Sequence, residues 1–594
     1  MEVWIEGKRA ALKRGTAFEY VEENRLFTDA DSYTLSITFP LKGCAQNRKI
    51  FGYLDRPDVN KEKVIFDCEL RERAFYKSGV LTIVEVTESE VVGQFLEGRS
   101  AQNYADDFDE VYINELDLGE WPSSVPETPP EAWGSIDDGF SCVALPWVNV
   151  QTGVMQNKVV YEDGAYAWGA PSRTSGTAVS WQSYLIEIAK RVLEALDYDY
   201  DFSPWETARE SYLIVCNALP AAWGITGFAR ALPHWSVTDF FAELEKILGG
   251  EFDINHRTQK VTFQFTRTLI AGMDEVCIRN VIDSYKAEVA ADSEVAYKGN
   301  ANRKYADGGH QLGCYYDCGW FIKANAAGAT HYPNPRSLLT ASASYATPGS
   351  TSTVRLSDKL LYVEDIDRYF VLRIIDKVEG EYSQSRQQQM YDSVYCLQQV
   401  NAFGEQVVKE DNGNVIELNI VPVCIDYTDA VNGFCLFVDP GTFGEDASSG
   451  TDATRTSTTD NSSIVQPRAA ATIERGQGES RSEYFDKIFV AYWDGRIDTE
   501  GYMPIPVIDE FLVGLDWELL NFDYTLHLAP ASRVCHHAID PKIKYSFYFL
   551  ADELPSVRSL FYIEGKKYLA ERITASFDEG GMSKRLKGEF YMVV

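Results

Sequence analysis

The chain has 594 residues, with 55 Lys and Arg against 89 Asp and Glu, and therefore a formal net charge of −34. Charged residues make up 24% and hydrophobic residues 45%, values that are ordinary for a folded soluble protein and exclude disorder as the main state. The acid surplus argues against a nucleic-acid reader, because neutralising phosphates requires clustered Lys and Arg.

Residues 1–120 show short apolar runs separated by polar turns and are predicted to form an N-terminal β module. Tyr33, Leu35, Ile37 and Phe39 alternate with other residues, which predicts one half-buried strand with four apolar side chains on the same face. The runs that follow continue this pattern. We expect one compact antiparallel barrel or sandwich.

Residues 100–157 contain no Lys or Arg but hold eleven carboxylates. Within them, residues 121–133 include four prolines, which cannot donate ladder hydrogen bonds and favour an extended chain. We therefore predict an acidic, proline-rich linker and extended segment over residues 121–178.

Two helices and a hairpin are predicted within residues 179–270. Apolar residues at three- and four-residue spacing predict a first helix of about five turns, and they are Trp181, Leu185, Ile188, Val192 and Leu196. Ser236 is predicted to cap a second helix, with Asp239 three residues later and Gly249 at its end. Alternating apolar residues then predict two strands, so this region is expected to be an α+β helix and hairpin unit.

Strands dominate the rest of the sequence. Residues 271–440 are predicted to form a β-rich module, residues 441–484 a mobile Ser/Thr/Gly-rich loop, and residues 485–594 a C-terminal β module. The expected fold class is α+β and β-rich, with several antiparallel barrel or sandwich modules and one helix-plus-hairpin unit. Because no run of about 20 apolar residues occurs, no membrane span is predicted.

Catalytic motifs of specific spacing are absent from the sequence, which contains no nucleophile elbow, P-loop, HExxH or dinucleotide fingerprint. His234 has no Ser or Cys at a spacing that would indicate a catalytic nucleophile and its base. It is interpreted as a packing or capping residue. Cys314 and Cys318 lack a second ligand pair, and the adjacent His536 and His537 would face opposite sides of a strand. We therefore predict no enzyme activity, no cofactor and no metal site.

Three stretches give the chain its resemblance to a known family. The central one is LPHWSVTDFFAELEKILGGEFDINHRTQKVTFQF at residues 232–265, a helix followed by a hairpin. The others are the opening TLSITFPLKGCAQNRKIFGY at residues 34–53 and the closing IEGKKYLAERITASFDEGGMSKRLKGEFY at residues 563–591. Together they resemble the tail-tip (baseplate) hub proteins of tailed bacteriophages, of the kind found in phages of Bacteroides-like hosts.

The resemblance implies a structural virion protein at the tail tip, assembled in the host cytoplasm. Such a hub is a homotrimer whose subunits each supply two similar β-barrel modules, closing the end of the tail tube and forming a conduit for DNA ejection. The implied partners are the tail tube and distal tail proteins, the tape-measure protein, and tail fibre or tip proteins. DNA would pass in transit without sequence recognition.

A conduit for DNA should not bind phosphate, and carboxylates in its wall would repel the polymer at close range. The basic-free segment supplies the candidate lumen-facing acids, with a solvated outer face as the alternative reading. These candidates are Asp106, Asp107, Asp109, Glu110, Glu115 and Asp117. Two other functions stay open from the sequence: a receptor- or carbohydrate-binding tail protein, and a tail-associated glycan hydrolase.

Overall fold

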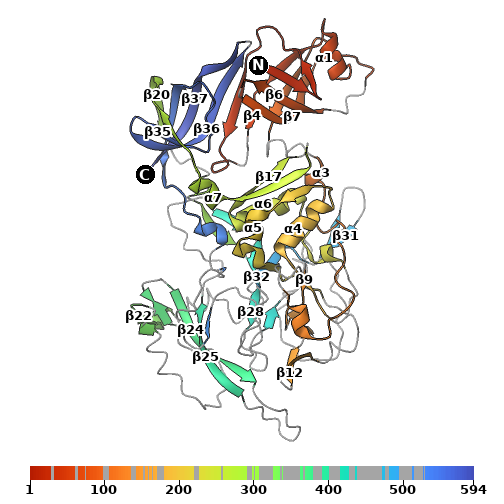
Figure 1. The fold of residues 1–594 in the computed structure, drawn as a ribbon, viewed down its shortest axis with the longest axis vertical. Helices are drawn as coiled ribbons and strands as arrows, with labels where there is room; N and C mark the ends of the chain where they lie inside the picture. The colour runs from red at the N-terminus through yellow and green to blue at the C-terminus, as the bar shows by residue number, and fades with distance from the viewer. Residues whose placement is uncertain are drawn as a thin grey trace.

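The computed structural model has the β-rich α+β fold that the sequence predicts, with several antiparallel sheets and few helices. It describes most of residues 1–306 and 526–594 and, between them, 326–338, 361–378, 391–400, 415–426, 435–437, 471–474, 480–493 and 511–513, with short gaps inside the longer ranges. Figure 1 shows a β module that contains both chain ends, a central α+β unit beside it, and a further small sheet at the opposite end.

The first of these parts, here called the sheet module, comprises residues 1–97, 273–289 and 539–594. Its 14 strands form one sheet in the order β2-β1-β6-β7-β8-β4-β3-β36-β37-β34-β20, with β5 on β8, and β35 between β36 and β19. Their bounds are β1 (Glu2–Ile5), β2 (Lys8–Ala10), β3 (Phe18–Glu23), β4 (Ser32–Thr34), β5 (Ile37–Pro40), β6 (Ile65–Glu72), β7 (Phe75–Val86), β8 (Glu90–Leu96), β19 (Glu275–Ile278), β20 (Val281–Val289), β34 (Ile539–Leu550), β35 (Leu560–Ile563), β36 (Lys566–Asp578) and β37 (Gly581–Val593). One helix, α1 (Ala45–Ile50), accompanies them.

The two ends of the sequence meet at the β3–β36 pair. Phe18 lies opposite Phe577 in antiparallel register, and their rings stack with centroids 5.6 Å apart. Tyr20 packs edge-on against Phe577, so one hydrophobic cluster runs through both halves of the sheet. The N-terminal half therefore consists of β1–β8, and the other half of β19, β20 and β34–β37.

The alternating run from Tyr33 to Phe39 does not form the single strand that its pattern predicts. It breaks into β4 and β5, and Leu35, between them, is 52% exposed whereas Ile37 and Phe39 are buried. At the break, the Leu35 amide donates a hydrogen bond to the Glu19 carbonyl of the neighbouring strand β3. Strand β4 pairs with β3 and β8 while β5 pairs with β8 alone, and this change of partners separates the two strands.

The central unit comprises residues 106–272, 302–306, 415–423 and 485–493 and has the largest hydrophobic cluster of the described chain. Its helices are α3 (Asp106–Asp109), α4 (Leu185–Glu194), α5 (Ser203–Glu206), α6 (Val237–Leu248) and α7 (Thr266–Ala271), with 3-10 turns at Pro129–Ala132, Arg209–Tyr212 and Phe228–Ala231. Its strands are β9 (Cys142–Val143), β14 (Gln182–Tyr184), β15 (Asp199–Asp201), β16 (Leu213–Val215), β17 (Gly250–Asn255), β18 (Lys260–Phe265), β21 (Asn302–Tyr305), β26 (Val415–Leu418), β27 (Ile420–Pro422) and β32 (Ile488–Tyr492).

The second predicted helix and its hairpin are confirmed. The Ser236 hydroxyl accepts a hydrogen bond from the Asp239 amide at the start of α6, and Gly249 ends the helix with a left-handed φ of 69°. Strands β17 and β18 then pair along their whole length, from Gly250–Phe265 to Asn255–Lys260. The rings of Phe252 and Phe263, 4.8 Å apart, bury the hairpin against α6.

The first predicted helix is shorter than its apolar stripe suggests. It begins at Leu185 and ends at Glu194, and the residues before it form strand β14. Here Ser183 lies opposite Val215 of β16 on one side and Cys142 of β9 on the other. Sheet pairing with distant segments therefore replaces the first helical turn that the sequence predicts.

Within the predicted linker, several of the described residues between 129 and 148 belong to the core of the central unit. Trp133, Val143 and Leu145 are buried in its hydrophobic cluster. Pro129 stands at the beginning of a short 3-10 turn, where a missing amide hydrogen costs no hydrogen bond. The prolines thus start a turn in a packed segment.

Further strands form smaller sheets. They are β10 (Val148–Gln151), β11 (Val154–Gln156), β12 (Val159–Glu162), β13 (Ala165–Trp168), β22 (Thr330–Tyr332), β23 (Leu361–Val363), β24 (Arg368–Val378), β25 (Tyr391–Val400), β28 (Cys424–Asp426), β29 (Cys435–Phe437), β30 (Ala471–Glu474), β31 (Ser480–Glu483) and β33 (Phe511–Val513). The short antiparallel pair β30–β31 lies inside the segment predicted as a loop, most of which falls outside the described residues. The domain boundaries themselves stay predictions.

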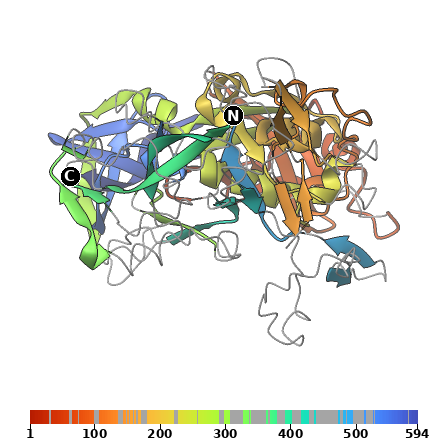
Figure 2. The same ribbon diagram turned by 90° about the horizontal axis from the view of Figure 1, so that it is seen from below.

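The C-terminal half of the sheet module is offset from the central unit. Viewed from below (Figure 2), the blue C-terminal strands and the orange elements of the central unit lie on opposite sides. Arg25, which is 3% exposed, joins the two parts: it donates to the Phe252 carbonyl of β17 at 3.3 Å and lies 3.5 Å from Glu251. Arg558 of the sheet module approaches the same Glu251 carboxylate at 2.8 Å.

Candidate functional site

The candidate acids lie on a segment that is attached to the start of α6. The Ile113 amide donates to the Trp235 carbonyl and the Val237 amide donates to the Val111 carbonyl, each at 2.9 Å. Phe108 of α3 is 1% exposed and packs against Tyr198, with ring centroids 5.1 Å apart. Hydrophobic anchoring and backbone pairing therefore fix where the acidic side chains emerge.

Asp109 and Glu110 emerge at the surface beside the α6 N-terminus. Both are exposed, and the Asp109 carboxylate accepts a hydrogen bond from the Thr238 hydroxyl in the first turn of α6. Helix N-termini carry partial positive charge, so a carboxylate here is stabilised locally. The side chains of Asp106 and Asp107 lie outside the described residues.

Glu115 differs from the other acids because its side chain is only 12% exposed. Its carboxylate lies 3.7 Å from Nδ1 of His234, the same nitrogen that contacts the Asn114 side-chain oxygen at 3.0 Å. The His234 ring also stacks on Tyr112 with centroids 3.9 Å apart. His234 is thus a packing residue, as the sequence predicts, and it holds Glu115 inside the central unit.

Asp117 is exposed and accepts a hydrogen bond from the Gly119 amide at 3.1 Å. Gly119 has a φ of 83°, a conformation that favours glycine, and so the chain turns sharply here. Arg191 of α4 donates to the neighbouring Leu118 carbonyl at 2.8 Å and lies over the Phe228 ring. This arginine, which no sequence motif indicates, anchors the far end of the acidic segment.

The structure therefore exposes three carboxylates, Asp109, Glu110 and Asp117, on one anchored segment, whereas Glu115 is mostly buried. These acids present negative charge to their surroundings. Within the described residues, no group of three or more His, Cys, Asp or Glu side chains is placed to hold a metal ion. None of the described helices is long and apolar enough to cross a membrane.

Two solved structures are similar to the chain at low TM-score. The 43 kDa tail protein of prophage MuSo2 from Shewanella oneidensis is 8% identical, with a TM-score of 0.29 over 100% of this chain and 97% of its own. The tail protein from Neisseria meningitidis MC58 is also 8% identical, with a TM-score of 0.21 over 67% of this chain and 90% of its own. Neither likeness carries an argument at these scores. No protein-family model matches the chain, and no curated protein matches it.

Proposed function

We propose that the protein is a structural component of a bacteriophage tail, a tail-tip hub that closes the tail tube and forms a conduit for DNA. One observation carries the proposal: the three stretches behind the family resemblance lie in one connected assembly. Residues 34–53 and 563–591 belong to the same sheet, and the helix–hairpin unit at 232–265 contacts that sheet through Glu251.

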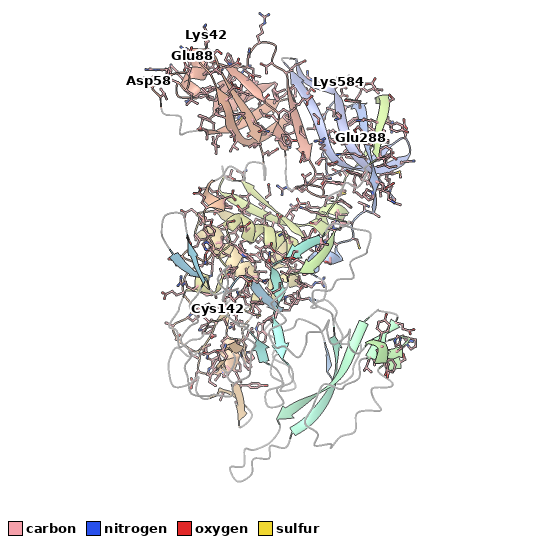
Figure 3. The ribbon with its side chains drawn as sticks, turned by 180° about the vertical axis from the view of Figure 1, so that it is seen from behind. Lys42, Asp58, Glu88, Cys142, Glu288 and Lys584 are labelled. Atoms are coloured by element: carbon pink, nitrogen blue, oxygen red, sulfur yellow. The ribbon has the colours of Figure 1, made fainter. Side chains whose placement is uncertain are left out.

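The division of the sheet module supports this role. A hub subunit is expected to supply two similar β modules, and the sheet has two halves that meet at β3–β36. In Figure 3, Lys42, Asp58 and Glu88 lie at the outer end of the N-terminal half, and Glu288 and Lys584 lie on the other half. Each half would then face a different subunit of the tail tube.

The oligomeric mass tests the hub. We expect light scattering to give three times the chain mass of 66.9 kDa, and electron microscopy to show a closed ring. Co-expression with the products of the neighbouring genes should add tail-tube protein to the ring. A monomer that binds host cells by itself, without other tail proteins, would instead support the receptor-binding alternative.

The conduit part of the proposal assigns the exposed acids to the channel wall. Replacing Glu110 with Lys would add a phosphate contact in the lumen, and each such contact slows release of the polymer. Particles that carry Glu110→Lys should therefore eject DNA more slowly, most clearly at low salt. Glu88→Lys is the matched control, because Glu88 is also an exposed carboxylate but belongs to the sheet module. Equal ejection rates for both variants would contradict the lumen assignment.

A further inference from the structure

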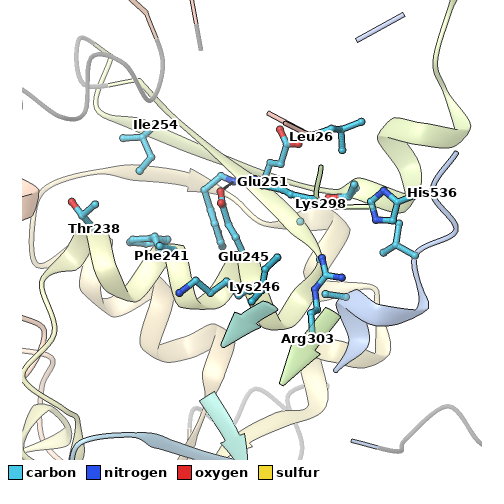
Figure 4. Close-up of a pocket in the computed structure, with 18 of the residues that line it drawn as sticks. Leu26, Thr238, Phe241, Glu245, Lys246, Glu251, Ile254, Lys298, Arg303 and His536 are labelled. Carbon is cyan, nitrogen blue, oxygen red and sulfur yellow. Dashed lines mark hydrogen bonds between the residues drawn. The ribbon is translucent and has the colours of Figure 1, made fainter. Parts of the chain in front are cut away.

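A cavity of about 320 Å³ lies beside α6 and β17, where the central unit meets residues 531–536. Its volume is at the lower end of the range of small-molecule sites, roughly 300–1,000 Å³. Figure 4 shows that its walls come from α6, the β17 hairpin, β21 and the segment carrying His536. None of the exposed acids proposed to line the channel lines this cavity, although Thr238, the partner of Asp109, does.

One end of the cavity carries the apolar side chains of Phe241 and Ile254, which are 3% and 6% exposed, with Thr238 and Lys246 beside them. In Figure 4, Phe241 and Ile254 lie on the side away from Arg303 and His536. This end could therefore bury the hydrocarbon part of a ligand, at roughly 25 cal/mol per Å² of apolar surface removed from water.

The other end gathers positively charged and polar groups. Arg303 of β21 is 9% exposed, and Lys298 and His536 lie close to it in the cavity wall. Burial lowers the pKa of Arg303 to about 10. Burial, together with the positive charges of Arg303, His537 and Lys298, lowers the pKa of His536 to about 4. At neutral pH the imidazole is uncharged, whereas the arginine keeps its charge.

The imidazole of His536 can form a further hydrogen bond at this end of the cavity. Its Nδ1 atom is buried and has no hydrogen-bond partner among the residues that the structure describes. A buried polar atom without a partner costs about 1–3 kcal/mol. A ligand oxygen near Nδ1 would remove that cost, because a neutral imidazole can donate one N–H.

The carboxylates in the cavity wall are already engaged by other groups. Glu251 is paired with Arg25 and Arg558 of the sheet module, at 3.5 Å and 2.8 Å. Glu245 accepts a hydrogen bond from the Phe252 amide at 2.7 Å. Arg303 and Lys298 therefore provide two positive charges at this end, within a protein whose overall charge is strongly negative.

We propose that this cavity binds a small amphipathic carboxylate, with its hydrocarbon body between Phe241 and Ile254 and its carboxylate toward Arg303 and His536. The apolar end sets the preference for a hydrocarbon chain. The charged end sets the preference for an anion, because a guanidinium can hold both carboxylate oxygens.

Binding of decanoate to the full chain tests the proposal, with 1-decanol and acetate as probes that lack either the charge or the hydrocarbon body. Calorimetric titration should show saturable binding of decanoate, with decanol and acetate at least about tenfold weaker. Decanoate should also raise the melting temperature, as any ligand specific to the native state does. Equal affinity for decanoate and decanol, or no saturable binding of decanoate, would overturn the proposal.

Two variants locate the site. Arg303→Gln should weaken decanoate binding about tenfold or more, because it removes a charge-assisted hydrogen bond. Lys298→Gln, at a half-buried position, provides a second variant if Arg303→Gln fails to fold, and it should weaken binding to a smaller extent. Arg585→Gln removes an exposed cation from the sheet module and serves as the matched control. Unchanged decanoate affinity in the folded cavity variants would refute the assignment.

Discussion

Replacing Arg25 with Met should weaken the connection between the sheet module and the central unit. The Arg25 side chain is almost fully buried, and its guanidinium lies near three groups of β17: the Phe252 carbonyl at 3.3 Å, Glu251 at 3.5 Å and Asp253 at 3.6 Å. Methionine keeps most of the apolar stem while removing the charge. The change therefore isolates the polar part of the contact.

The expected loss in the free energy of unfolding is about 2–3 kcal/mol. A hydrogen bond from a charged donor to the Phe252 carbonyl accounts for about 1.5–3 kcal/mol. The contact with Asp253 adds little, because that carboxylate is 68% exposed and solvent screens it. Glu251 keeps Arg558 at 2.8 Å, so the variant avoids the full penalty of about 3–5 kcal/mol for an unpaired buried charge.

Urea denaturation with two probes measures this loss. Tryptophan fluorescence reports mainly on the central unit, where Trp133 and Trp205 are buried, and circular dichroism reports on all strands. The control is Arg585→Met, whose ion pair with Asp283 is more than half exposed on both sides and should contribute less than about 0.5 kcal/mol. If both variants lower the free energy of unfolding equally, Arg25 does not join the two parts as described.

Three further changes test the helix–hairpin unit and the cavity. Ser236→Ala removes the cap on the Asp239 amide and should cost about 1 kcal/mol in a thermal melt, whereas Ser236→Thr should retain most of it. Gly249→Ala should cost more than about 1 kcal/mol in urea denaturation, because φ is 69° and an added Cβ would lie 2.7 Å from the Ala531 Cα; an unchanged midpoint would contradict that geometry. The pKa of His536, about 4 against an ordinary 6.5, means that the unfolded chain takes up a proton first as pH falls. The free energy of unfolding should therefore drop by about 1–3 kcal/mol between about pH 6.5 and 4, and His536→Gln should remove that part of the pH profile.

Local signals in the sequence predicted local structure well. The second helix could be delimited because Ser236 and Gly249 act on backbone groups within a few residues. The first helix could not, because the choice between strand and helix at Gln182–Tyr184 depends on pairing with β9 and β16. The spacing of apolar residues does not indicate which distant strands will pair with this segment.

The acidic segment and the cavity were likewise predictable only where local sequence determines them. The carboxylates of the acidic segment could be named from the sequence, but the burial of Glu115 follows from its contact with His234, more than a hundred residues away. The cavity was not predictable, since Arg303 and His536 belong to unrelated stretches with no motif in common. Only packing of β21 against residues 531–536 brings them together.

The route of the chain has a mechanical consequence. The described strands run from the sheet module (β1–β8) to the central unit (β9–β18), back to β19 and β20, out again to β21–β33, and return at β34. The backbone thus crosses between the two parts four times. A single crossing would allow the two parts to rotate relative to each other, whereas four crossings restrict both bending and twisting between them. A rotation of the central unit against the sheet module would therefore strain several connections at once.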